Sequence, residues 1–189
     1  MIAIKAYRRD LAVAYARRWA LDRNPLFYNF AGIGGDCTNF VSQCILAGSC
    51  VMNFTPDFGW YFISADNRAP AWTGVEFFWR FMTGAPDFAN ANGGIGPFGN
   101  PAEADDMEPG DVVQLGREEG DFYHTLLVTA RRGDELLVSA HTNDVYNRPL
   151  SLYTAPRRRF LKIRGVAFEV GGDNNCYEAL VEGRALPAF

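Results

Sequence analysis

Residues 34–48 read GGDCTNFVSQCILAG, and this stretch decides how the rest of the chain is interpreted. The glycines permit a sharp turn and Asp36 is a good N-cap, so Cys37 would occupy the first position of a helix that Gly48 ends. The positive end of a helix stabilises a thiolate, and its free amides can donate to an oxyanion. The stretch therefore predicts a reactive cysteine. The alternative is that Cys37 is a small buried hydrophobic residue, which is the usual state of a free cysteine.

Helical spacing predicts one helix before this stretch and one after it. The first has Asp10 as its N-cap and stops before Pro25. The second covers 74–82, where Thr73 and Glu76 have the spacing of a capping box. Together with the central helix, these segments place the helices in the first half of the chain.

The period of the apolar residues changes from Pro109 onward. Residues 86–101 are rich in Gly, Asn and Pro and are predicted to form a long loop. Beyond them, alternating apolar residues predict strands at 111–115, 124–130, 135–141 and 159–170. Helices followed by an antiparallel sheet are typical of an α+β domain.

The composition is that of an ordinary globular chain of 189 residues, with 48% hydrophobic and 21% charged residues. We expect one domain over 1–189, with its core at about 5–170 and a C-terminal tail at 171–189. The net charge of −4 gives no reason to expect nucleic acid as a partner. No apolar run is long enough for a membrane span, and no signal peptide is visible. Compartment and oligomeric state stay open, and no cofactor is predicted.

The chain contains two histidines, and both are predicted to end up on one face of the sheet. His124 begins one strand and His141 ends the next. A hairpin turn at 132–133 would put His141 opposite His124, whereas a turn at 133–134 would put Asn143 there. In either register His141 and Asn143 share a face with His124, because strand side chains alternate.

A cysteine and a histidine oriented by a third polar group form a generalised catalytic triad. We therefore predict Cys37 as nucleophile, His124 as general base and His141 as the residue that orients it. A structural histidine is the alternative reading. A zinc site of two histidines and Asp144 is disfavoured, because no HxxxH or CxxC spacing is present.

The aromatic residues between 54 and 81 are the third feature of the sequence. Large rings in loops either wall a substrate cleft or pack in the core, and the sequence leaves both possibilities open. The residues predicted to contact substrate are Asp36, Trp60, Tyr61, Trp72, Asn143 and Asp144. Among the other cysteines, Cys44 is expected in the core, and a bridge between Cys50 and Cys176 stays geometrically open.

Several segments in the same order resemble the bacterial "putative amidase domain" family, which is similar to CHAP-type cell-wall peptidases of the papain-like superfamily. They are GGDCTNFVSQC (34–44), TPDFGWYFISADNRAPAWTGV (55–75), EPGDVVQL (108–115), FYHTLLVTA (122–130) and LLVSAHTNDVYNRPLS (136–151). The resemblance covers roughly residues 5–165. It implies a papain-like α+β fold in which N-terminal helices pack on a C-terminal antiparallel sheet.

Carried over by position, the resemblance implies the same nucleophile and base. His141 is the best match to the third member, with Asn143 and Asp144 as alternatives. The glutamine that precedes the nucleophile in papain-like enzymes is missing, so backbone amides, Asn39 or Gln43 would have to bind the oxyanion.

The function implied is hydrolysis of a peptide or amide bond, preferably in a peptide of the bacterial cell wall. The alternative from another class is a catalytically inactive module of the same fold that binds glycan or peptide. Acyl transfer to an amine other than water is a third possibility, which the sequence cannot separate from hydrolysis.

Overall fold

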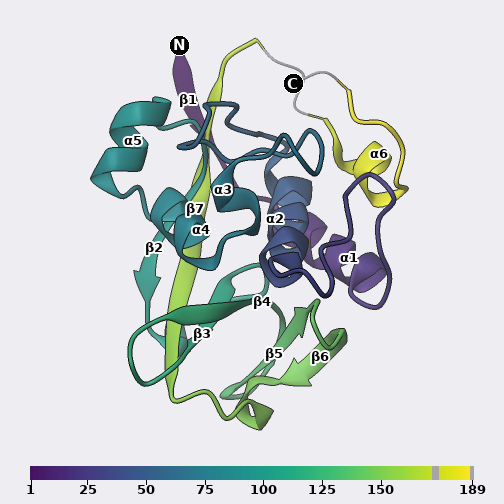
Figure 1. Ribbon diagram of the computed structural model, residues 1–189, viewed down its shortest axis with the longest axis vertical. Helices are drawn as coiled ribbons and strands as arrows, with labels where there is room; N and C mark the ends of the chain where they lie inside the picture. The colour runs from purple at the N-terminus through teal and green to yellow at the C-terminus, as the bar shows by residue number, and fades with distance from the viewer. Residues whose placement is uncertain (172–174, 188–189) are drawn as a thin grey trace.

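The computed structural model describes residues 1–171 and 175–187. Its helices are α1 (Arg9–Trp19), α2 (Asp36–Ser49), α3 (Pro70–Thr73), α4 (Val75–Met82), α5 (Pro86–Asn92) and α6 (Tyr177–Val181), with 3-10 turns η1 (Ala104–Asp106) and η2 (Leu150–Leu152). Its strands are β1 (Ile2–Lys5), β2 (Gly96–Ala102), β3 (Val112–Gly116), β4 (Phe122–Arg132), β5 (Glu135–Ala140), β6 (Val145–Pro149) and β7 (Arg157–Glu169) (Figure 1). The mixed α+β class predicted from the sequence is confirmed.

Within the described part of the chain, the strands form one seven-stranded sheet whose pairings are all antiparallel. The order is β1-β7-β3-β4-β5-β6, and β2 also pairs with β7. The long strand β7 pairs with β3 near its start and with β1 near its end. The strands β3, β4 and β5, which follow one another in the chain, lie next to one another below α2 in Figure 1.

Both faces of the sheet are covered, because neighbouring residues of each strand point to opposite sides. Val112 and Leu127 face the helices and belong to the main hydrophobic core. Val113 and Leu126 face the other way and form a second, smaller core. The second core is closed by residues of the segments around η1 and η2, of which Met107 and Leu150 are buried.

Helix α2 occupies the centre of the helical layer, between α1 and the sheet (Figure 1). All of its residues are buried. Such a helix is apolar or internally bonded on every side, so it has no solvent-facing stripe. Because α2 contacts both α1 and β4, it connects the helical layer to the sheet.

The prediction of a long loop at 86–101 is wrong. Residues 86–92 form α5, which Pro86 can begin because a proline fits the first turn of a helix. Residues 96–102 form β2, in spite of Pro97 and Pro101. This strand pairs only with β7, and prolines are tolerated on such an edge strand.

Several helix ends differ from the sequence-based expectation. Asp10 lies in the first turn of α1 instead of capping it, and there it pairs with Arg8. The capping box is also absent, because Thr73 ends the separate short helix α3 and its hydroxyl accepts from Arg68. Gly48 does not end α2, which continues to Ser49.

Cys50, which follows α2, forms a disulfide with Cys176 immediately before α6. The bridge that the sequence left open is therefore present, and it joins the C-terminal segment to the central helix. Cys37 and Cys44 are free and buried. None of the helices in the described ranges has the length and apolar character needed to cross a membrane.

Candidate active site

Cys37 lies at the start of α2, at the second helical position. Gly35 precedes the helix with a positive φ of 95°, which a glycine adopts without strain, and Asp36 is the first helical residue. Asp36 is therefore not the N-cap that the sequence predicted. Amides in the first turn of a helix have no carbonyl partner within the helix, so they remain available at this end.

Cys37 packs against strand β4, and the residue is only 5% exposed. Burial raises the pKa of its thiol, and hydrogen bonds from the backbone of Thr125 and from Thr38 offset this only in part. Thr38 and Thr125 are themselves joined through their hydroxyls at 2.9 Å. These contacts dock the first turn of α2 onto β4 directly beside His124.

His124 lies on β4, where it pairs with Leu115 of β3. Burial lowers the pKa of His124 to about 4, so the imidazole is neutral at pH 7. The rings of Tyr123 and Tyr153 lie near it, each with its centroid 6.4 Å from that of the imidazole. Among the described residues, none forms a hydrogen bond with the His124 ring, so its nitrogens are available to a reacting group.

Cys37 and His124 line the same cavity, which has a volume of about 470 Å³. Its remaining wall comes from the turn before α2, from β3 and β4, and from the segment between β5 and β7. These residues are Gly34, Gly35, Leu115, Tyr123, Thr142, Asn143, Arg148, Leu152, Tyr153, Thr154 and Ala155. A thiol and a neutral imidazole that line one cavity are groups that nucleophilic catalysis can use.

His141 does not share a face with His124, and that prediction is wrong. The hairpin turn is at 133–134, one of the two turns considered, since Arg132 pairs with Glu135. A β-bulge between Val128 and Ala130 then shifts the register by one residue. A shift of one residue moves side chains to the opposite face, so His141 points toward α2 with Thr125.

His141 is buried between α1 and α2. Its Nε2 lies 2.9 Å from the carbonyl oxygen of Trp19, and its ring stacks on Phe40 with centroids 4.2 Å apart. Its Nδ1 lies 3.1 Å from Asp36 Oδ2.

Asp36 is fully buried and cannot contact substrate, contrary to the prediction. Burial alone would raise its pKa, but His141, Asn39 and Arg23 hold the pKa of Asp36 below its ordinary value. Arg23 also forms a bidentate pair with Asp144, at 2.8 and 3.0 Å. Asp144 is therefore paired with Arg23 outside the cavity. Together these charged residues stabilise the start of α2.

The predicted aromatic wall is wrong for Trp60, Tyr61 and Trp72, which belong to the main core. The indole N–H groups of the two tryptophans donate to Ser42 and Asn39 on α2, so both rings can be completely buried without losing a hydrogen bond. The rings lie 4.9 Å apart. They pack α2 into place and do not reach the cavity.

Neither amide side chain that was considered for the oxyanion reaches the cavity. Asn39 donates to Tyr28 and to Asp36, and Gln43 accepts from Tyr15. Both are buried inside the helical layer. Backbone amides near Cys37 are left as the candidates.

Asn143, which was predicted to contact substrate, lies in the cavity wall. Among the wall residues that the sequence did not single out, three carry an aromatic ring or a charge. They are Tyr123, Arg148 and Tyr153. Arg148 and Tyr153 come from the region of β6 and η2, which the sequence did not identify as ordered structure. No local pattern marks them, because only the return of this segment over β4 brings them to His124.

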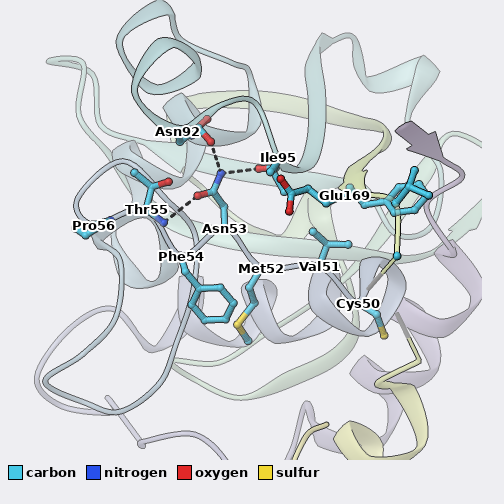
Figure 2. Close-up of a pocket in the computed structure, with 13 residues that line it drawn as sticks. Cys50, Val51, Met52, Asn53, Phe54, Thr55, Pro56, Asn92, Ile95 and Glu169 are labelled. Atoms are coloured by element: carbon cyan, nitrogen blue, oxygen red, sulfur yellow. Dashed lines mark hydrogen bonds between the residues drawn. The ribbon is translucent and has the colours of Figure 1, made fainter. Parts of the chain in front are cut away.

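A second cavity of about 730 Å³ lies between the residues after α2 and the end of β7 (Figure 2). Figure 2 shows that the Asn53 side chain spans its wall by hydrogen bonds to Asn92, Ile95 and Thr55. Its cysteine, Cys50, is in the disulfide. With no free thiol or imidazole among its described lining residues, this cavity lacks the groups for the predicted chemistry.

The described residues contain no group of three or more His, Cys, Asp or Glu side chains that could hold a metal ion. The zinc site considered from the sequence would need His124, His141 and Asp144 together. His141 faces α2, and Asp144 pairs with Arg23. These positions do not bring the three side chains to one point.

The fold and the cavity thus define an α+β domain in which a free cysteine and a histidine line one cavity. The family model described as "Putative amidase domain" matches residues 6–163, and the chain belongs to this family. It is 32% identical over 142 residues to the "Uncharacterized protein YhbB" of Bacillus subtilis (strain 168), which is 73% of this chain and 42% of that protein. It is 27% identical over 161 residues to "Uncharacterized protein YjcM" of the same organism, or 81% and 35%.

The chain therefore spans less than half the length of these two curated relatives. No solved structure matches it. The comparisons thus give the family, and the family's description suggests a hydrolase of amide bonds.

Proposed function

We propose that this domain is a cysteine-dependent hydrolase of amide bonds that acts through a thioester acyl-enzyme. The observation that carries the proposal is the shared cavity of Cys37 and His124, with the sulfur docked at the residue next to the histidine. Membership of the "Putative amidase domain" family supports the same reaction class.

The reaction starts from a neutral thiol and a neutral imidazole. His124 accepts the thiol proton as the Cys37 sulfur attacks the amide carbonyl. The C–N bond then breaks, and the imidazolium returns its proton to the leaving amine. Water, deprotonated by the same imidazole, attacks the thioester and releases the acid product and the free thiol.

The oxyanion that forms on the attacked carbonyl needs hydrogen-bond donors close to the sulfur. We assign this role to the backbone amides of the turn and first helical residues around Cys37. The glycines Gly34 and Gly35 line the cavity without side chains and leave room for a substrate carbonyl. The positive end of α2 adds to the stabilisation of the negative oxygen.

A papain-like arrangement and a peptide of bacterial peptidoglycan as substrate belong to this proposal. A nucleophile at the start of a central helix and a base on the adjoining antiparallel sheet support the first. The disulfide between Cys50 and Cys176 supports a substrate outside the cytoplasm, because disulfides persist in oxidising compartments.

The test is incubation of the protein with purified peptidoglycan, followed by mass spectrometry of the released fragments. Wild-type protein should release peptides with new amino and carboxyl ends. Cys37→Ala should release none, whereas Cys44→Ala, which alters the other free cysteine, should remain active. Identical fragments from wild type and Cys37→Ala would contradict the proposal for this substrate.

Two outcomes would redirect the proposal. Binding of peptidoglycan without any cleavage would indicate a binding module of the same fold. Transfer products formed with an added amine acceptor would indicate acyl transfer in place of hydrolysis.

A further inference from the structure

Arg148 gives the cavity a positive charge that the reaction itself does not use. It is the arginine of the cavity wall, and no Asp or Glu occurs among the described lining residues. His124, with a pKa of about 4, adds no charge at pH 7. A positively charged cavity in a chain of net charge −4 indicates selection for a negatively charged ligand group.

The guanidinium of Arg148 is available to such a group. No described residue forms an ion pair or side-chain hydrogen bond with it, and its Cζ lies 5.0 Å from the centre of the Tyr153 ring. Arg158, on β7, differs because it donates to the carbonyl oxygens of Leu150 and Tyr153. Arg158 therefore holds the wall in place, and Arg148 keeps its donors free.

The position of Arg148 assigns it to one half of the substrate. Tyr153 is the common neighbour of Arg148 and His124, with the imidazole centroid 6.4 Å from its ring. The imidazole protonates the leaving amine, so the amine half of the substrate lies beside His124. Because the distances to the Tyr153 ring are 6.4 Å and 5.0 Å, the imidazole centroid and the guanidinium carbon are at most about 11 Å apart. With a hydrogen bond at each end, this span holds no more than about one amino-acid residue.

We propose that the domain selects amides whose leaving amine belongs to a residue with a free carboxylate, and that Arg148 binds this carboxylate. The inference rests on the proposed function, because it uses His124 to define the amine side. Arg148 acts as a specificity residue, since a planar guanidinium can hold a carboxylate through two parallel hydrogen bonds. Substrates of this class release a free amino acid or a peptide whose first residue is acidic.

The test uses pooled acetyl-Xaa-Ala dipeptides with a free C-terminal carboxylate and the matched pool of C-terminal carboxamides. Cleavage rates at pH 7 are measured by mass spectrometry as relative kcat/KM. Wild-type protein should prefer the carboxylates by about 10- to 100-fold, the range expected for a charge-assisted pair. Arg148→Gln should reduce this preference to less than about threefold.

Arg132→Gln is the matched control, because Arg132 is exposed at the end of β4 outside the cavity wall. It removes the same charge and should keep the full preference. Equal cleavage of both pools by wild type, or an Arg148→Gln variant that keeps the preference, would overturn the inference. Cleavage that still depends on Cys37 would in that case leave the proposed function standing.

If no cleavage depends on Cys37, a binding measurement still tests the role of Arg148 separately from the proposed hydrolysis. Equilibrium dialysis of the same pools against Cys37→Ala and against the double variant with Arg148→Gln needs no catalysis. Retention of carboxylates at least tenfold over carboxamides, lost in the double variant, supports the role of Arg148 even if hydrolysis fails. Equal retention of both pools overturns it.

Discussion

At the scale of single residues, burial sets the ionisation of the two central groups. It raises the pKa of the Cys37 thiol and lowers that of His124, because a low-dielectric site disfavours both charged forms. The resting pair is therefore a thiol and a neutral imidazole. In the proposed reaction, proton transfer therefore accompanies attack on the substrate, and His124 must be unprotonated when substrate binds.

The pH dependence of the reaction follows from this state. The neutral form of His124 is present above a pKa of about 4, so kcat/KM should stay constant down to about pH 5 and fall by half near pH 4. The profile should be measured with an uncharged amide substrate. Full recovery of activity at pH 7 after exposure to pH 4 serves as the control for unfolding. An acid limb near pH 6.5 would contradict the buried environment of His124.

His141 should act on stability rather than on the ionisation of His124. It bridges the Trp19 carbonyl and the Asp36 carboxylate inside the helical layer, so His141→Gln should lower the free energy of unfolding by about 2–4 kcal/mol. Urea unfolding measures the loss, and the acid limb of kcat/KM should not move. Large loss of activity with unchanged stability and a shifted acid limb would instead restore the orienting role predicted from the sequence.

At the scale of elements, one inserted residue in a hairpin decides which face His141 occupies. The residues that favour a turn form a local pattern, and the observed turn at 133–134 is one of the two turns that this pattern allowed. The bulge at Thr129 is not visible in the alternating pattern of β4. The Thr129 hydroxyl bonds to Ser139 on β5 and Asn147 on β6, contacts that exist only once these two strands are paired.

Gly48 in helix α2 allows the cost of steric crowding to be compared with the gain in helix propensity. A Cβ on Gly48 would lie 2.4 Å from the Tyr7 ring and 2.7 Å from the Arg8 carbonyl oxygen. Gly48→Ala should therefore destabilise the protein by about 1–3 kcal/mol, although alanine favours a helix by about 1 kcal/mol. Thermal and urea unfolding measure the change.

The next residue of the same helix supplies the matched control. The buried Ser49 hydroxyl has no hydrogen-bond partner among the described residues. Ser49→Ala should therefore be neutral or slightly stabilising. Equal stability of Gly48→Ala and wild type would mean that the Tyr7 segment does not pack closely on α2.

At the scale of the whole molecule, the C-terminal segment is tied back onto the first helices. Cys176 is bonded to Cys50 across a sequence separation of 126, and α6 accepts hydrogen bonds from Trp19 and Asn24 through its carbonyl oxygens. These contacts attach the last described helix to the layer that carries Cys37. The disulfide is therefore expected to stabilise the fold as a unit.

Reduction of this disulfide should lower the free energy of unfolding by about 3–5 kcal/mol, because a long loop in the unfolded chain is released. Urea unfolding with and without a reductant measures the effect. Cys176→Ala should lower stability by a similar amount and should not respond to the reductant. Unchanged stability of wild type under reduction would show that the noncovalent contacts of α6 suffice.

The sequence by itself determined the features that depend on neighbouring residues. The glycines before Asp36 start a helix one residue before Cys37, and alternating apolar residues make β3, β4, β5 and β7. These signals led to the α+β class and to Cys37 and His124 as candidates. The catalytic roles of the two residues remain predictions.

Only the tertiary structure decided which side chains meet. Pairing with β7 makes a strand of the proline-containing segment 96–102, and the α2 side chains Ser42 and Asn39 draw Trp60 and Trp72 into the core. The return of the chain after β5 places Arg148 in the cavity wall. Each of these results depends on partners distant in sequence, because burial and strand register are properties of the packed chain and not of a local pattern.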